Sequence, residues 1–202
     1  FAERNFSKTK GIIPQFKIQK KTSSIIEKRK GIDQANLVLA YHLPLSDDKK
    51  SYAAKVLEVL MGGGMSSRLW SEIREKRNLA YGVKANSDIH KDYAYSVIYV
   101  GTKKENIDVV KRLILEEFQK VSKEFTEKEL EEVKEQIIGN YNISMEDSSN
   151  QMFNLLLSEV DGNSREFYEF EKNILKVNLK EVQELAKKAC QKYSFFVLEP
   201  EN

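Results

Sequence analysis

The chain has 202 residues, 41% of them hydrophobic and 32% charged, a length and composition that predict one or two globular domains. The chain contains nine glycines and three prolines, too few for a collagenous or low-complexity chain. The longest apolar run, residues 37–41, is far short of the roughly 20 residues that cross a bilayer. A single cysteine, Cys190, excludes a disulfide framework within the chain and a zinc site built from several thiolates.

Charge is unevenly distributed along the chain. The 33 basic and 31 acidic side chains give a net charge of +2, but residues 1–31 carry nine basic and only two acidic groups. Such a segment could contact nucleic acid or anionic lipid. Its basic residues form no helical stripe and its aromatic residues are few, so we expect a solvated entry segment and no nucleic-acid or membrane partner. The chain shows no secretion signal and starts at Phe1 rather than Met, so we expect a cytoplasmic protein and a segment cut from a longer polypeptide.

The first half of the chain is predicted to be rich in strands. Residues 1–15 are expected to be a linker remnant, and residues 16–202 a single domain. The predicted elements are an edge strand within 16–27, a buried strand over 35–41, a helix after Asp48 that stops at the glycines 62–64, a second helix to about Lys76, and strands over 79–89 and 93–100. Ser66 or Ser67 is expected to cap the second helix.

The second half is predicted to be helical until a last strand. Apolar residues keep a period of 3.6 from Ile107 to Val121, and Thr126 to Glu129 is a capping box that opens a long helix. Further helices are expected over 149–158, 165–177 and 179–192, the last capped by Asn178, and a strand over 195–198. The predicted fold class is α+β, with an antiparallel sheet packed on one side by helices.

The two histidines do not form a metal site in the sequence. His42 ends the buried strand, His90 lies in a turn beside Asp92, and no H-x-x-E-H or H-E-x-x-H motif occurs. We therefore expect no metal or other cofactor bound by this segment.

Three consecutive glycines, Gly62, Gly63 and Gly64, follow the first helix. A phosphate-binding loop would need a strand before the glycines and a Lys-Ser or Lys-Thr pair after them, and neither is present. A helix corner needs one glycine or two. Three allow close approach of another chain, so residues 62–66, through Met65 and Ser66, are candidates for binding a peptide.

Arg74 and Tyr81 are the candidate catalytic residues. Arg74 is expected in the last turn of the second helix and Tyr81 just after the following turn, so the two could converge and offer fixed hydrogen-bond donors to a carbonyl or oxyanion. The simpler interpretation, which the residues alone favour, is a solvated helix face formed by Arg68, Arg74 and Arg77 with a strand that starts at Tyr81.

The segment GGGMSSRL over residues 62–69, followed by EIREKRNLAY over 72–81, resembles the second domain of the insulinase/pitrilysin family of zinc peptidases. The mitochondrial processing peptidases and their short bacterial relatives belong to that family. The order of predicted elements over about residues 16–200 matches as well. The resemblance implies a pair of similar α+β domains that close around an extended peptide.

The resemblance also implies roles for individual residues. The first domain of such proteins carries zinc on an H-x-x-E-H motif, and the second supplies an arginine and a tyrosine seven positions apart, which here are Arg74 and Tyr81. Tyr81 would hydrogen-bond the developing oxyanion, and Arg74 would hold a substrate carbonyl or steady Tyr81. The glycine run would line the shared chamber. Zinc would then reside in the partner domain.

Two functions follow as hypotheses. In the first, the segment is the non-zinc half of a zinc metalloendopeptidase, inactive alone, whose partners are a zinc-bearing domain in the same or another chain and a peptide substrate. In the second, it is a catalytically inactive scaffold or peptide-binding subunit of the same family. A homodimer is possible in either case.

Overall fold

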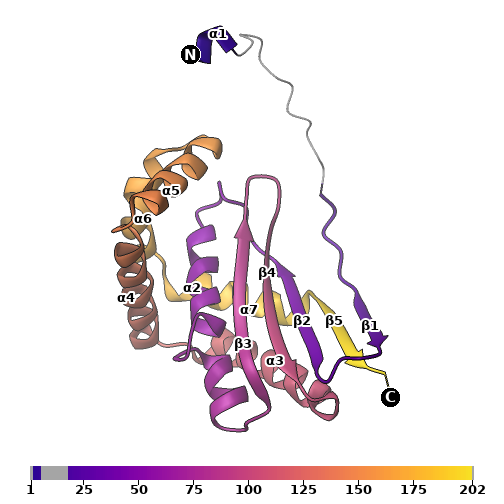
Figure 1. The fold of residues 1–202 in the computed structure, drawn as a ribbon. Coiled ribbons are helices and arrows are strands. Elements are labelled where there is room, and N and C mark those ends of the chain that lie inside the picture. Colours follow the sequence, from indigo (N-terminus) through magenta and orange to yellow (C-terminus); the bar gives the residue numbers. More distant parts are fainter. Residues whose placement is uncertain (1, 6–17, 202) are drawn as a thin grey trace.

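The computed structural model describes residues 2–5 and 18–201, and Figure 1 shows its fold. The strands are β1 (Ser24–Arg29), β2 (Ala35–His42), β3 (Ala80–Ile89), β4 (Ala94–Thr102) and β5 (Tyr193–Pro200). The helices are α1 (Ala2–Asn5), α2 (Ser51–Gly62), a π-helix (Trp70–Glu75), a 3-10 turn (Lys104–Asn106), α3 (Ile107–Glu124), α4 (Glu127–Ser144), α5 (Ser148–Val160), α6 (Arg165–Leu175) and α7 (Leu179–Gln191).

The five strands form one sheet in the order β1-β5-β2-β4-β3. Alternate side chains of β2, such as Leu37 and Leu39, are buried on one face, while Val38 and Ala40 are half-buried on the other. Pairs β2–β4, β2–β5 and β3–β4 are antiparallel, and the predicted α+β class is confirmed. The sheet is nevertheless mixed, because β1 lies parallel to β5 at the edge.

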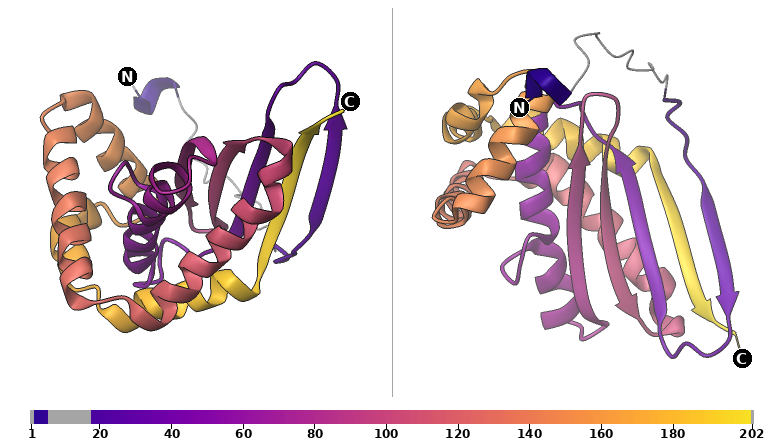
Figure 2. Two further views of the ribbon diagram at one scale, coloured as in Figure 1. Left: turned by 90° about the horizontal axis from the view of Figure 1, so that it is seen from below. Right: turned by 45° about the horizontal axis from the view of Figure 1, so that its top comes forward.

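Helices cover one face of the sheet. Figures 1 and 2 show α3 and α7 across this face, α2 beside the edge strand β3, and α4, α5 and α6 farther out beyond α2. The buried side of α3 includes Val110, Ile114 and Phe118, which pack into the core with the inward face of β2. The apolar period predicted for this helix is therefore the one that faces the sheet.

Both predicted capping motifs are confirmed. The Thr126 side chain accepts a hydrogen bond from the backbone N–H of Glu129, whose carboxylate accepts from the backbone N–H of Thr126. Asn178 and Glu181 form the same reciprocal arrangement at the start of α7. The cap expected from Ser66 or Ser67 is wrong, because no side chain caps the π-helix and the Ser67 hydroxyl donates to the Gly64 carbonyl at 2.7 Å instead.

The N-terminal predictions are only partly covered. The linker expected over 1–15 lies largely outside the described residues, although 2–5 form the short helix α1. The edge strand expected within 16–27 begins at Ser24, and it extends to Arg29. Across the described residues, no helix is both long and apolar enough to span a membrane.

Candidate functional site

Each of the three glycines at the end of α2 has a local structural cause. A side chain at Gly62 would place its Cβ 2.7 Å from the Cβ and the backbone N of Ala85, so α2 approaches β3 as closely as it does only with glycine there. At Gly63 a Cβ would lie 2.5 Å from the Val59 Cα. Gly64 has a φ of +140°, a conformation that side chains disfavour. Packing and backbone conformation alone account for the run, so a binding role must rest on what the glycines line.

The glycines line a cavity with a volume of about 760 Å³. The Gln136 side chain of α4 donates to the Gly63 carbonyl at 3.4 Å and ties the loop to the opposite wall. Met65 also lines this cavity and is 73% exposed, while Ser66 is exposed and does not line it. The cavity is therefore open to solvent and bordered by backbone as well as apolar groups. Other lining residues are Val59, Trp70, Val83, Asn86, Ile137, Tyr141, Asn154 and Phe170.

A π-helix and a left-handed residue bring Trp70, Arg74 and Tyr81 together. The Lys76 N–H donates to the Ser71 carbonyl, five residues earlier, at 2.9 Å, where an α-helix would use the carbonyl four residues earlier. Asn78, with a φ of +52°, then reverses the chain, and β3 starts two residues later. Local backbone geometry therefore places the start of β3 beside the last turn of the helix.

The Arg74 guanidinium lies between two aromatic rings. Its Cζ is 4.1 Å from the centroid of the Trp70 ring and 5.6 Å from that of Tyr81. Both contacts are within the range of a cation–π interaction, which restricts the guanidinium without using its N–H donors. Tyr81 is 83% exposed and Arg74 is half-buried. The arrangement therefore leaves hydrogen-bond donors of both side chains accessible to a ligand.

Arg74 and Tyr81 do not line the glycine cavity. They line a separate depression of about 580 Å³, together with Gln34, Asn78 and Asn106. Trp70 lines the glycine cavity and stacks on Arg74, so this one ring connects the two hollows. The candidate peptide-binding and catalytic residues thus form two neighbouring groups.

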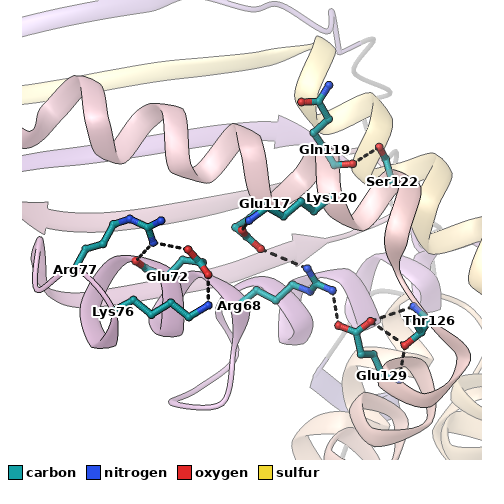
Figure 3. Close-up of polar contacts among 10 residues, drawn as sticks. All are labelled: Arg68, Glu72, Lys76, Arg77, Glu117, Gln119, Lys120, Ser122, Thr126 and Glu129. Atoms are coloured by element: carbon teal, nitrogen blue, oxygen red, sulfur yellow. Dashed lines mark hydrogen bonds and ion pairs between the residues drawn. The ribbon is translucent and has the colours of Figure 1, made fainter.

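Ion pairs hold the helix that carries Trp70 and Arg74, as Figure 3 shows. Arg68 pairs with the buried Glu117 of α3 at 3.4 Å and with Glu129 of α4. Burial disfavours the charged form of Glu129, but hydrogen bonds from Thr126 and the nearby Arg68 outweigh it and lower its pKa. The simple interpretation of Arg68 as a solvated residue is therefore wrong.

Glu72 holds the end of the same helix. Its carboxylate accepts from Lys76 and Arg77, and its carbonyl accepts from Arg77 at 2.9 Å (Figure 3). The hydrogen bond from Lys76, together with that from Arg77, lowers the pKa of Glu72 despite its partial burial. These contacts of Glu72 with Lys76 and Arg77 stabilise the end of the helix that carries Arg74.

The residues present do not fit a zinc site. Within residues 2–5 and 18–201, no three His, Cys, Asp or Glu side chains gather in a way that could hold a metal ion. The His42 Nε2 lies 3.4 Å from the Lys21 carbonyl oxygen, and the His90 Nε2 lies 2.7 Å from a carboxylate oxygen of Asp88. Neither histidine therefore belongs to a metal-binding cluster in the described part of the chain.

Trp70 and Glu72 belong to the candidate site but were not predicted from the sequence. Trp70 is the only tryptophan of the chain and lies four positions before Arg74 on one helix, a spacing that allows side-chain contact. Glu72 lies four and five positions before Lys76 and Arg77, a spacing that could have revealed its ion pairs. Both signals were present in the sequence.

Known proteins resemble this chain in sequence and fold. Residues 1–137 match the family model described as the peptidase M16 inactive domain. An uncharacterized zinc protease of Bacillus subtilis is 29% identical over 190 residues, covering 93% of this chain and 45% of that protein. The structure of a protease from Helicobacter pylori has a TM-score of 0.86 at 20% identity, covering 97% of this chain and 49% of that one.

A third similarity concerns a domain on its own. The inactive peptidase domain of a Bordetella parapertussis protein has a TM-score of 0.72 at 16% identity, and the match covers 85% of this chain and 94% of that one. The present chain spans less than half the length of the Bacillus and Helicobacter proteins. The expected resemblance is confirmed at the level of this domain. The chain belongs to the family of peptidase M16 inactive domains.

Proposed function

We propose that this chain is the non-zinc half of a zinc metalloendopeptidase, which binds peptide substrate and supplies Arg74 and Tyr81 to a chamber shared with a zinc-bearing half. The observation that carries the proposal is the Arg74 guanidinium held between the Trp70 and Tyr81 rings at the edge of an open depression. The name of the Bacillus subtilis relative, a zinc protease, supports the class of reaction.

The chemistry assigned to this chain is stabilisation of negative charge. The Tyr81 hydroxyl is a neutral donor and Arg74 is a permanently charged one, and both suit the oxygen of a peptide carbonyl as it becomes an oxyanion. Stacking against Trp70 restricts Arg74 before substrate arrives, so less conformational entropy is lost when the donors engage. The zinc chemistry belongs to the other half.

Peptide binding is assigned to the cavity beside the glycine loop. Its volume of about 760 Å³ suits a few side chains of an extended peptide, and the glycines of the loop carry no side chains that would fill it. Trp70 lines this cavity and stacks on Arg74, so a peptide seated in the cavity would contact the ring that also holds one of the two donors.

Replacement of Tyr81 by Phe in the assembled enzyme tests the proposal. Loss of one oxyanion donor typically costs about 3 kcal/mol, so kcat should fall about 100-fold while peptide affinity changes much less. Tyr168→Phe is the matched control, because Tyr168 is also largely exposed and lies on α6. An unchanged kcat for Tyr81→Phe would remove Tyr81 from this role.

The alternative is a catalytically inactive scaffold or peptide-binding subunit. It is favoured by one observation, that the glycine cavity and the Arg74 depression are separate hollows. A scaffold would bind peptide without accelerating its hydrolysis, whatever zinc-bearing half is added. A parent reading frame or adjacent gene that encodes H-x-x-E-H argues for the peptidase, and its absence argues for the scaffold.

A further inference from the structure

Helix α5 carries an apolar stripe that faces solvent. Its members recur at the spacing of one helix face, and between 39% and 68% of each is exposed; they are Met152, Phe153, Leu156, Leu157 and Val160. Ile143, near the end of the preceding helix, is 68% exposed as well. No charged residue occurs between positions 148 and 158, although a third of the whole chain is charged.

A stripe of this kind normally faces the protein core. The corresponding stripe of α3 does so, with Val110, Ile114 and Phe118 fully buried. In α5 no residue is buried, and the helix rests on its neighbours through the half-buried Asn154, Leu155 and Ser158. An apolar surface of this extent without charged groups is typical of a surface that another body covers.

We propose that α5 is the surface on which the zinc-bearing half docks. The Bacillus and Helicobacter proteins extend beyond the matched region by more than the length matched, which is enough chain for a second domain of equal size. Asn154, on the half-buried face of α5, lines the glycine cavity, so the helix that carries the stripe also borders that cavity. A second copy of this chain would cover the same stripe without bringing a metal.

The size of the surface is consistent with a domain rather than a short peptide. Thirteen residues of helix extend about 20 Å, so the stripe can form the apolar centre of an interface of about 800 Å² per partner. Because the stripe itself is apolar and residues 148–158 carry no charge, its partner surface should be apolar too, and a polar peptide segment would leave the stripe in water. This inference rests on the proposed function, since it assumes that a zinc-bearing half exists.

The test measures binding of this chain to the separately produced segment that carries H-x-x-E-H, by analytical ultracentrifugation or calorimetry. Production of the domain alone is reasonable, because the Bordetella structure is a chain that consists almost entirely of this domain. The double variant Phe153→Glu/Leu156→Glu should weaken binding by about 30-fold or more, as substitutions at the centre of an interface do. Its fold, followed by circular dichroism and Tm, should be unchanged, because both side chains are exposed.

Ile26→Glu is the control, because Ile26 is an equally exposed apolar residue on β1, at the opposite side of the sheet (Figure 1). It should leave the Kd within about twofold of that of the unmodified chain. An unchanged Kd for the double variant overturns the inference, and so does a dimer of this chain alone that the double variant abolishes. Tyr81→Phe tests the chemistry without touching α5, so the two proposals fail separately.

Discussion

At the scale of single residues, the glycine run shows how one sequence motif can have two explanations. Three glycines suggested access for a peptide, yet each has its own steric or conformational cause in the fold. The two explanations are compatible, because a loop without side chains packs closely and also exposes backbone. They differ in what a substitution does to stability.

Gly62→Ala should lower the free energy of unfolding by about 1–3 kcal/mol, because its Cβ would overlap the backbone and side chain of Ala85. Gly139→Ala, inside α4, has nothing within 4 Å and should instead raise stability by up to about 1 kcal/mol. Urea denaturation of both variants checks the pair. Equal stabilities would mean that α2 does not depend on close contact with β3.

Trp70 is predicted to position Arg74. In the proposed two-half enzyme, Trp70→Leu removes the ring against which the guanidinium stacks and should lower kcat about 3- to 10-fold, in line with a contact of about 1 kcal/mol. Trp70→Phe keeps an aromatic face and should recover most of the activity. If Phe and Leu reduce kcat equally, the ring only fills space, and the stacking has no part in the reaction.

At the scale of elements, regular patterns predicted the structure and local backbone exceptions did not. β2 and β4 were predicted close to their observed positions from the alternation of apolar residues, and the starts of α4 and α7 from the caps Thr126 and Asn178. Each of these signals is local in the sequence. The π-helix depends on a backbone hydrogen bond from Lys76 to the Ser71 carbonyl, five residues earlier instead of four, which no side-chain pattern encodes. The α5 helix was predicted from its period, but its exposure depends on what packs around it.

The ion pairs around the π-helix give the fold a dependence on pH. Glu72 and Glu129 both have a pKa below the ordinary 4.5, so their charged forms stabilise the fold above that pH. This stabilisation is lost as pH falls through the lowered values. Thermal unfolding should therefore show a decrease in Tm between about pH 5 and pH 3 that is smaller in Glu72→Gln.

Glu132→Gln is the control for this experiment, because the Glu132 side chain is 62% exposed and its pair with Lys128 is long, at 3.8 Å. Its pH dependence should match that of the unmodified protein. If Glu72→Gln and Glu132→Gln behave alike, the pairs at the end of the π-helix contribute nothing specific to folding.

At the scale of the whole molecule, the candidate site consists of two hollows and an apolar helix surface, all open to solvent. The Arg74 depression and the glycine cavity are open, and the apolar stripe of α5 is uncovered beside the cavity. Sequence reasoning placed Arg74 and Tyr81 at the two ends of one turn, and the structure brings their side chains together. It could not show that Trp70 stands between two hollows, because that depends on how α4 and α6 pack against α2.

The chain alone is predicted to be inactive. Peptide hydrolysis by this reaction class needs an activated water, and the described residues offer no cluster that could hold the metal to activate it. Purified chain dialysed after exposure to zinc should retain less than one ion per molecule and should not cleave a fluorogenic peptide. A mixture of this chain with the segment that carries H-x-x-E-H should bind zinc and cleave the peptide. Tight one-to-one zinc retention by the isolated chain would contradict the assignment, because the metal would then belong to this half.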